Sequence, residues 1–166
     1  SVNSMESYYS FADIEAQLRL LLGSGEYDVV IHAAAVSDFS VASIESTERG
    51  AVGANGGKLS SEAGLVVHLE PNPKLLESLK SWSGNPELRV IGFKLTDTDD
   101  LQQRITAIKK QFNQSGVDAV VHNDLSEISQ AAHPFYLHAP ARDPVHCVDS
   151  EALAQSINEL VLSMNS

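Results

Sequence analysis

Apolar and polar residues alternate along this chain in blocks that predict strands and helices in turn. One apolar run, residues 27–36, ends in Ala33, Ala34 and Ala35 and is followed by Asp38. A continuous apolar run of this length predicts a strand buried on both faces of a parallel sheet, and ligands bind just beyond the carboxyl ends of such strands. We therefore expect a ligand to lie against the alanines and to meet Asp38.

Helical spacing of apolar residues recurs at four places, and a capping signal precedes each. Ser10 and Asp13 form a capping-box pattern, Asn72 stands before Pro73 at a first helical position, and Ser150 precedes the last helix;. The sequence therefore predicts four helices, over about residues 11–22, 75–82, 101–112 and 153–164.

Further apolar runs over residues 89–95 and 118–122 predict two more buried strands;. Three strands that alternate with helices imply right-handed crossovers and a parallel sheet. Residues 135–139 and 145–148 predict an antiparallel hairpin. The expected fold is α/β, a Rossmann-like three-layer parallel sheet with flanking helices and an added hairpin, in a single domain over residues 1–166.

Residues 41–58 are small and polar and include four glycines, a composition that favours a mobile flap over a regular element;. Two short strands, 58–61 and 65–69, are predicted around a turn at 62–64. A nucleotide-binding α/β domain usually opens with a strand and a glycine-rich turn. This chain opens with a polar stretch and a helix, so we expect its first βαβ unit to be absent.

The composition of the chain excludes several classes of binding partner and indicates its cellular setting. The 166 residues carry a net charge of -11 with 11 Lys and Arg, which argues against nucleic-acid and acidic-membrane partners;. No apolar run reaches the length of a membrane span, and the amino terminus lacks the basic segment of a signal peptide;. Cys147 is the single cysteine, which favours a reducing, cytoplasmic setting;.

Several residues have both a structural and a chemical interpretation. Asp38 either caps a turn or binds a ligand, and the helix start at 71–74 is either ordinary or an anion site;. Lys58 follows two glycines, but Val52 and Leu59 stand where a P-loop needs Gly and Ser or Thr;. The lysine is then either solvated or closes over an anion. The six histidines show no ligand spacing, so no metal site is predicted;.

Five segments together carry a family resemblance. In this order, they resemble phosphopantothenate-cysteine ligase of coenzyme A biosynthesis: residues 30–38, 58–61, 71–74, 91–94 and 121–124. The resemblance implies that CTP in most bacterial members, or ATP in eukaryotic ones, activates 4'-phosphopantothenate as an acyl nucleotide. L-cysteine then displaces the nucleoside monophosphate. It also implies Mg²⁺ with the triphosphate and a homodimer.

The resemblance also assigns roles to particular positions of this chain. His32, Ala33 and Ala34, with Ala35 beside them, match the strand end that packs on the nucleotide, and Asp38 matches its acidic contact. Lys58 matches the lysine that neutralises the acyl nucleotide, where a positive charge in a closed site is most effective;.

The remaining matches concern a turn, a strand and a helix. Pro71, Asn72, Pro73 and Lys74 match a nucleotide-contacting turn, Phe93 matches a residue near the base, and Lys110 lies near a family lysine. The family's glycine-rich turn and phosphopantothenate-binding segment have no counterpart in these residues. We therefore expect a carboxy-terminal portion of the ligase, which alone binds substrates poorly and is inactive.

Two other interpretations stay open. Residues 28–34 also resemble the mid-sheet strand of extended short-chain dehydrogenases and sugar epimerases, which bind NAD(P). However, the chain lacks their Tyr-x-x-x-Lys pair and their GxGxxG turn. The other alternative is a noncatalytic nucleotide-binding or assembly module that remains after loss of the first unit.

Overall fold

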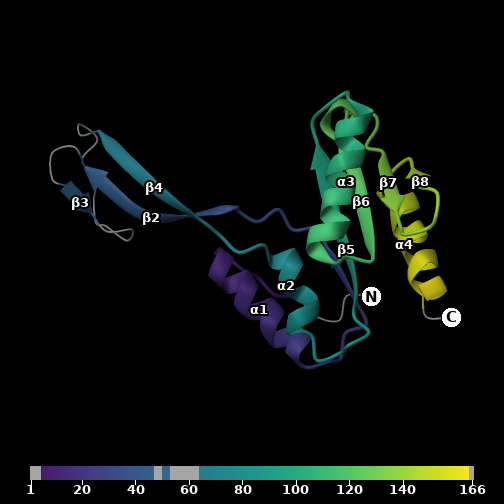
Figure 1. Cartoon of the computed structure of the whole chain (residues 1–166), viewed down its shortest axis with the longest axis horizontal. Coiled ribbons are helices and arrows are strands. Elements are labelled where there is room, and N and C mark those ends of the chain that lie inside the picture. The colour runs from purple at the N-terminus through teal and green to yellow at the C-terminus, as the bar shows by residue number, and fades with distance from the viewer. Residues whose placement is uncertain (1–4, 47–49, 53–63, 165–166) are drawn as a thin grey trace. The chain divides into compact units, whose positions relative to one another are not determined.

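A computed structural model of the chain describes residues 5–46, 50–52 and 64–164 (Figure 1). The chain divides into two compact units, one of residues 1–15 and 35–74 and the other of residues 16–34 and 75–166. The first unit contains an antiparallel ribbon and the second contains the main sheet. The assignment of residues 1–166 to a single domain stays a prediction.

The second unit is built on a five-stranded sheet with the order β1-β5-β6-β7-β8. Its strands are β1 (Val29–His32), β5 (Arg89–Thr96), β6 (Ala119–Asp124), β7 (Phe135–His138) and β8 (Val145–Cys147). β1, β5 and β6 run parallel, whereas β7 and β8 are antiparallel additions. The predicted α/β fold, with its parallel sheet, flanking helices and hairpin, is confirmed.

Helices cover both faces of this sheet, and each face has its own core. On one face α4 (Ser150–Met164) packs on a buried cluster that includes Ile91, Val121, Phe135, Leu137, Leu153 and Ile157. On the other face the end of α1 (Phe11–Gly23), α2 (Leu75–Trp82) and α3 (Leu101–Ser115) supply a second cluster that includes Leu22, Leu79, Val90, Ile108 and Val120. Because side chains alternate along a strand, the stretches of β5 and β6 that feed both clusters are continuously apolar, as at Val90–Ile91 and Ala119–Val121;.

Two of the four helix starts, those of α1 and α3, follow the predicted capping signals. Ser10 Oγ accepts the N–H of Asp13 at 3.1 Å, and the Asp13 carboxylate accepts the N–H of Ser10 at 2.9 Å, so the capping box is confirmed. Asp100 caps α3 through backbone N–H groups of the first turn. The cap of α4 is Asp149 rather than Ser150, since an Asp149 oxygen accepts the N–H of Ala152 at 2.8 Å.

β1 lies at the edge of the sheet, so the prediction of a strand buried on both faces is wrong. β5 is its only partner in the described part of the chain, and α4 packs further along, against β7 and β8. Ile31 is consequently 51% exposed although it belongs to an apolar run. The strand also ends at His32, so the three alanines follow it rather than belong to it.

The first unit contains a three-stranded antiparallel ribbon in the order β3-β2-β4. β2 spans Phe39–Ser46, β3 spans Gly50–Val52 and β4 spans Leu65–Pro71. The prediction of an irregular flap over residues 41–58 is therefore wrong for 41–46 and 50–52, because β2 pairs with a distant strand. Residues 65–69 form a strand as predicted. Lys58 and the predicted strand 58–61 lie outside the described residues.

The ribbon has one apolar and one polar face. The β2–β4 register shifts between Val41 and Ser43, and this bulge brings Val41 and Ile44, three residues apart, onto the same face;. We call this the apolar face of the ribbon; its members are Phe39, Val41, Ile44, Leu65, Val67 and Leu69. The opposite face carries mainly polar side chains, including the ion pair of His68 with Glu45.

Candidate functional site

Three of the predicted site residues meet in the first unit, next to the start of β2. The Nζ of Lys74 lies 2.5 Å from a carboxylate oxygen of Asp38, although the two residues are 36 positions apart. The backbone N–H of Asn72 donates to the carbonyl of Asp38 at 2.8 Å. The Asp38 and Lys74 side chains are 64% and 56% exposed, so both charges are open to a ligand.

The Asn72 side chain bonds to residues at the start of β2 instead of capping a helix. Its Oδ1 accepts from Ser40 Oγ at 2.7 Å, and its Nδ2 donates to the carbonyl of Ser37 at 3.0 Å. Because these bonds occupy the amide, α2 begins only at Leu75. The prediction of Asn72 as a helix cap with Pro73 at the first helical position is therefore wrong. Pro71 is the last residue of β4, and residues 72–74 connect this strand to α2.

Other predicted residues lie in the second unit, on β1, β5 and α3. His32 ends β1 and is half-buried, and burial lowers the pKa of its imidazole. Phe93 lies on β5, half-buried against the cluster under α4. Lys110 is exposed in the second half of α3, next to Gln111, whose Nε2 donates to the carbonyl of Phe93 at 3.3 Å. The roles proposed for these residues stay predictions.

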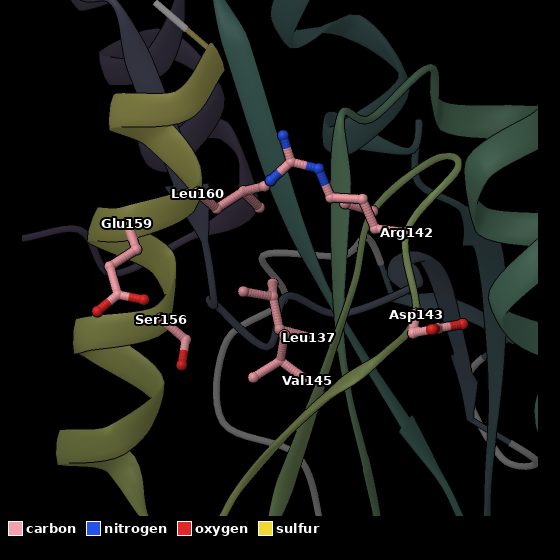
Figure 2. A pocket seen from close by; sticks show the side chains of 8 residues that line it. Leu137, Arg142, Asp143, Val145, Ser156, Glu159 and Leu160 are labelled. Atoms are coloured by element: carbon pink, nitrogen blue, oxygen red, sulfur yellow. The ribbon is translucent and has the colours of Figure 1, made fainter.

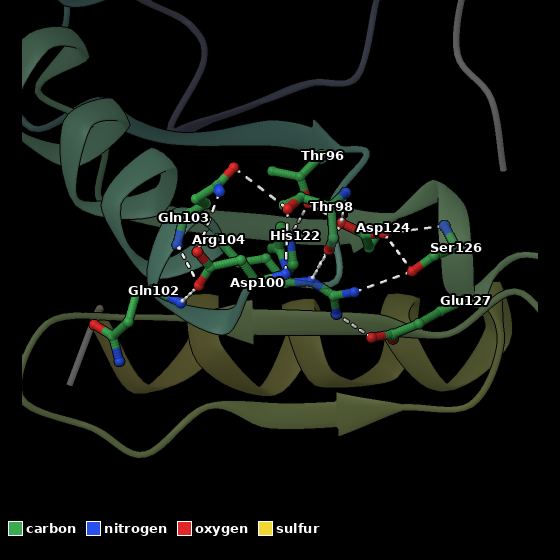
Figure 3. A network of polar contacts seen from close by, with 10 residues as sticks. All are labelled: Thr96, Thr98, Asp100, Gln102, Gln103, Arg104, His122, Asp124, Ser126 and Glu127. Carbon is green, nitrogen blue, oxygen red and sulfur yellow. Dashed lines mark hydrogen bonds and ion pairs between the residues drawn. The ribbon is translucent and has the colours of Figure 1, made fainter.

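Sequence reasoning missed a buried ionic network at the carboxyl ends of β5 and β6 (Figure 3). Asp124 is fully buried, and Arg104 of α3 reaches it with Nε at 3.3 Å. The same Nε donates to the carbonyl of Thr98 at 2.7 Å, and Nη2 donates to Ser126 Oγ at 3.0 Å. Nη1 pairs with Glu127 of the 3-10 turn η1 (Leu125–Glu127). One guanidinium thus joins the end of β6 to the two loops that follow β5 and β6.

Asp124 is held in its charged form. Burial by itself raises the pKa of this carboxyl, but hydrogen bonds from Thr96, Ser126 and Thr98 outweigh burial and set the pKa well below its usual value;. One carboxylate oxygen accepts from the N–H and the hydroxyl of Ser126 at 3.0 and 2.7 Å. The other accepts from the Thr96 hydroxyl and from the N–H of Thr98.

The network also fixes the tautomer of His122. The Thr96 hydroxyl has one proton, which it donates to the Asp124 carboxylate, since a carboxylate only accepts;. The contact of 2.8 Å between Thr96 Oγ1 and His122 Nε2 must therefore be donated by the imidazole. His122 carries its hydrogen on Nε2, and burial, followed by the charge of Arg104, lowers its pKa.

One sequence signal points to this network. Arg104 stands in the first turns of α3, where the positive end of the helix dipole disfavours a cation;. An arginine there needs a specific acidic partner, and the structure supplies Asp124 and Glu127. Neither partner can be identified from helical spacing, because Asp124 ends the next strand and Glu127 follows it.

A hollow of about 140 Å³ lies between the β7–β8 hairpin and α4 (Figure 2). Leu137 and Leu160 line it, and the charged side chains of Arg142, Asp143 and Glu159 are exposed at its rim. It contains none of the predicted site residues. In the described part of the chain, no three histidine, cysteine or acidic side chains gather as metal ligands, and no helix is long and apolar enough to cross a bilayer.

Residues 17–163 match the model of the family described as the DNA/pantothenate metabolism flavoprotein C-terminal domain. The chain belongs to this family. Two curated relatives, both named coenzyme A biosynthesis bifunctional protein CoaBC, are 35% identical. The relative from Methanocaldococcus jannaschii matches over 102 residues, 61% of this chain and 22% of its own length. The relative from Thermococcus kodakarensis matches over 112 residues, 68% of this chain and 24% of its own length.

Several solved structures share the fold. The DNA/pantothenate metabolism flavoprotein from Streptococcus pneumoniae superposes with a TM-score of 0.81 at 21% identity, over 96% of this chain and 72% of its own. A C-terminal domain of CoaBC superposes with a TM-score of 0.64 at 15% identity, over 96% of this chain and 65% of its own. A Cab2 mutant in complex with phosphopantothenate-cysteine superposes with a TM-score of 0.64 at 19% identity, over 95% of this chain and 51% of its own. The chain is thus similar to the C-terminal domain of CoaBC, and it spans about a quarter of its curated relatives.

Proposed function

We propose that this chain is the nucleotide-binding part of a phosphopantothenate-cysteine ligase. In that reaction CTP or ATP activates the carboxylate of 4'-phosphopantothenate as an acyl nucleotide, and the amine of L-cysteine displaces the nucleoside monophosphate. Membership of the family supports the proposal, as does the similarity to proteins named for coenzyme A biosynthesis. The observation that carries it is the meeting of Asp38, Asn72 and Lys74 from segments far apart in sequence.

The chemistry of this cluster suits a ligand that carries both hydroxyl and phosphate groups. The Asp38 carboxylate can accept from hydroxyls, and the Lys74 ammonium can meet a phosphate where negative charge develops. Their ion pair is exposed, and exposed pairs contribute only about 0–1 kcal/mol;. A ligand can therefore replace the contact between Asp38 and Lys74 at small cost.

Lys58 and Mg²⁺ complete the proposal on the strength of the family resemblance. Lys58, outside the described residues, is proposed to neutralise the acyl nucleotide. Mg²⁺ is usually bound by one or two carboxylates together with substrate phosphates. The carboxylate of Asp38 could be such a magnesium ligand. The described residues contain no cluster of three or more potential metal ligands. We therefore propose that Mg²⁺ arrives bound to the triphosphate.

Isothermal titration calorimetry with Mg-CTP, Mg-ATP and NADPH tests the proposal on the 166-residue chain. We expect weak but saturable binding of one triphosphate, loss of that binding in Lys58→Ala, and weakening by about tenfold in Asp38→Ala. Asp143→Ala, which removes an exposed acid in the β7–β8 loop, is the matched control and should bind as the unaltered chain does. Binding of NADPH alone would favour the dehydrogenase, and binding of none of the three would favour the noncatalytic remnant.

We further propose that the protein forms a homodimer, in which the apolar face of the ribbon contacts a second copy of this chain. Isolated two-stranded and three-stranded ribbons need a covered apolar face for stability, and large uncovered apolar patches mark interaction sites. On the apolar face of the ribbon Phe39, Val67 and Leu69 are 53%, 48% and 57% exposed. A two-fold contact would cover both copies of this face at once.

Adjacent residues of β4 provide a matched test of the dimer. Val66 and Val67 are each 48% exposed, but only Val67 lies on the apolar face. Sedimentation equilibrium should show a dimer for the unaltered chain and for Val66→Glu, and a monomer for Val67→Glu. A monomer in the unaltered chain, or equal loss of the dimer in both variants, would contradict this surface as the interface.

A further inference from the structure

The ionic network around Asp124 has a composition that stability alone does not explain. It sets two carboxylates, the fully buried Asp124 and the 28% exposed Glu127, against the single guanidinium of Arg104, whose side chain is 13% exposed. Replacement of a buried ion pair by apolar residues is often neutral or stabilising, because desolvation of the charges offsets their attraction. Buried ionic groups are best attested where they select one geometry among several. The network therefore calls for a geometric role.

Its contacts hold the carboxyl end of the sheet at several points. Thr96 is the last residue of β5 and Asp124 the last residue of β6, and their side chains are bonded to each other. Arg104 binds the carbonyl of Thr98 in the connection from β5 to α3, and Ser126 in η1. The strand ends and both following loops consequently form one connected polar network (Figure 3).

The opposite ends of the same strands provide a comparison. Asp118, just before β6, accepts the N–H of Val90 at 2.7 Å and pairs with Lys80 at 2.9 Å. Its side chain is 15% exposed and that of Lys80 is 41% exposed, so this cluster reaches solvent. It also contacts β5 but leaves the loops beyond the carboxyl ends untouched. Of these two clusters, only the network around Asp124 contacts those loops.

We propose that Arg104 and Asp124 are positioning residues that fix the carboxyl ends of β5 and β6 for nucleotide binding, an inference that rests on the proposed function. Phe93, assigned to the neighbourhood of the base, is three residues before Thr96 on β5. A movement of the end of β5 would therefore shift Phe93. Misplacement of a contact by about 1 Å can lower the rate of an enzyme by about two orders of magnitude. Neither Arg104 nor Asp124 needs to touch the ligand.

Binding constants measured beside thermal unfolding test this role. Titrations of Mg-CTP and Mg-ATP are run on the unaltered chain, Arg104→Met, Arg104→Lys and, as control, Asp118→Ala, each at a temperature where it is fully folded. We expect affinity for the bound triphosphate to fall about tenfold in Arg104→Met. Arg104→Lys keeps the charge but cannot reproduce the four contacts, so its affinity should also fall. Asp118→Ala should unfold at a lower temperature yet keep the affinity of the unaltered chain.

Each result decides between the alternatives. Unchanged affinity in Arg104→Met, or an equal loss in Asp118→Ala, would reduce the network to a structural element. If Arg104→Met does not fold, Ser126→Ala replaces it: this variant removes one partner of Arg104 and of Asp124 without a change of charge, and should weaken binding about threefold;. Absence of triphosphate binding to the unaltered chain would overturn the proposed function and this inference with it.

Discussion

The two ends of β5 and β6 hold carboxylates in contrasting surroundings. At the amino ends, Asp118 pairs with Lys80 and Arg89, two side chains that reach solvent. At the carboxyl ends, Asp124 is fully buried and pairs with Arg104. Ligands of parallel sheets bind at the carboxyl ends. The contrast indicates that this protein specifies the geometry of its strand ends most strictly where a ligand is expected.

The largest effect should separate the two carboxylates by stability. Asp124→Ala removes one of the two carboxylate partners of Arg104 and leaves the donors of Thr96, Thr98 and Ser126 without their acceptor. We therefore expect the free energy of unfolding to fall by about 3–5 kcal/mol. Asp118→Ala should cost about 1–2 kcal/mol, because solvent can compensate its partners. Urea unfolding followed by circular dichroism measures both. Equal losses would show that the two ends are held alike.

Backbone packing, rather than buried charge, tightens the amino side of the sheet. A Cβ at Gly84 would lie 2.9 Å from the carbonyl oxygen of Gly23, the last residue of α1. Gly84→Ala should therefore destabilise the protein by about 1–3 kcal/mol. Gly23→Ala is the control, since a Cβ there meets nothing within 4 Å. Thermal unfolding of the two variants should differ clearly, and similar midpoints would argue against this close approach.

The pH dependence of stability should carry the signature of Asp124. Its pKa is lower in the folded protein than the usual value of 3.8, so the unfolded chain binds the proton more readily;. The stability that this carboxylate contributes is complete above about pH 5 and is lost as the pH falls through the acid range. Urea midpoints between pH 6 and pH 3 should decline less steeply in Asp124→Asn than in the unaltered chain. Parallel profiles would contradict the assignment.

The smallest effect on stability is expected in the first unit. Asp38→Asn and Lys74→Gln each break one exposed ion pair, and the free energy of unfolding should change by less than about 1 kcal/mol;. Both variants should nevertheless weaken triphosphate binding if these charges face the ligand. A stability loss as large as that of Asp118→Ala would instead identify the pair as a structural contact.

Prediction from sequence succeeded where the signal is local. The helices and the parallel strands follow from apolar spacing and from caps such as Ser10 and Asp100. The ribbon could not be predicted, because β2 pairs with β4 across a long separation, with Phe39 opposite Pro71. The bulge after Val41 also breaks the alternation that usually indicates a strand;.

The candidate site shows the same limit. Asp38 and Lys74 stand out individually in the sequence, but their contact depends on how β2 and the turn after β4 meet. Arg104 signals the need for an acid by its place near a helix start;. Which acid satisfies it depends on the neighbouring strand, since Glu127 is 23 residues away. Long-range pairing of this kind is fixed by the fold and not by local pattern.

The most direct test of nucleotide binding at the carboxyl ends is a titration of the ¹⁵N-labelled chain with Mg-CTP and Mg-ATP, followed through its backbone amide resonances. Binding there predicts saturable shifts at the carboxyl half of β5, from Phe93 to Thr96, and little change at Arg89 and Asp118 at the amino ends. Shifts confined to the amino ends, or none at triphosphate concentrations on the order of 1 mM, would contradict it.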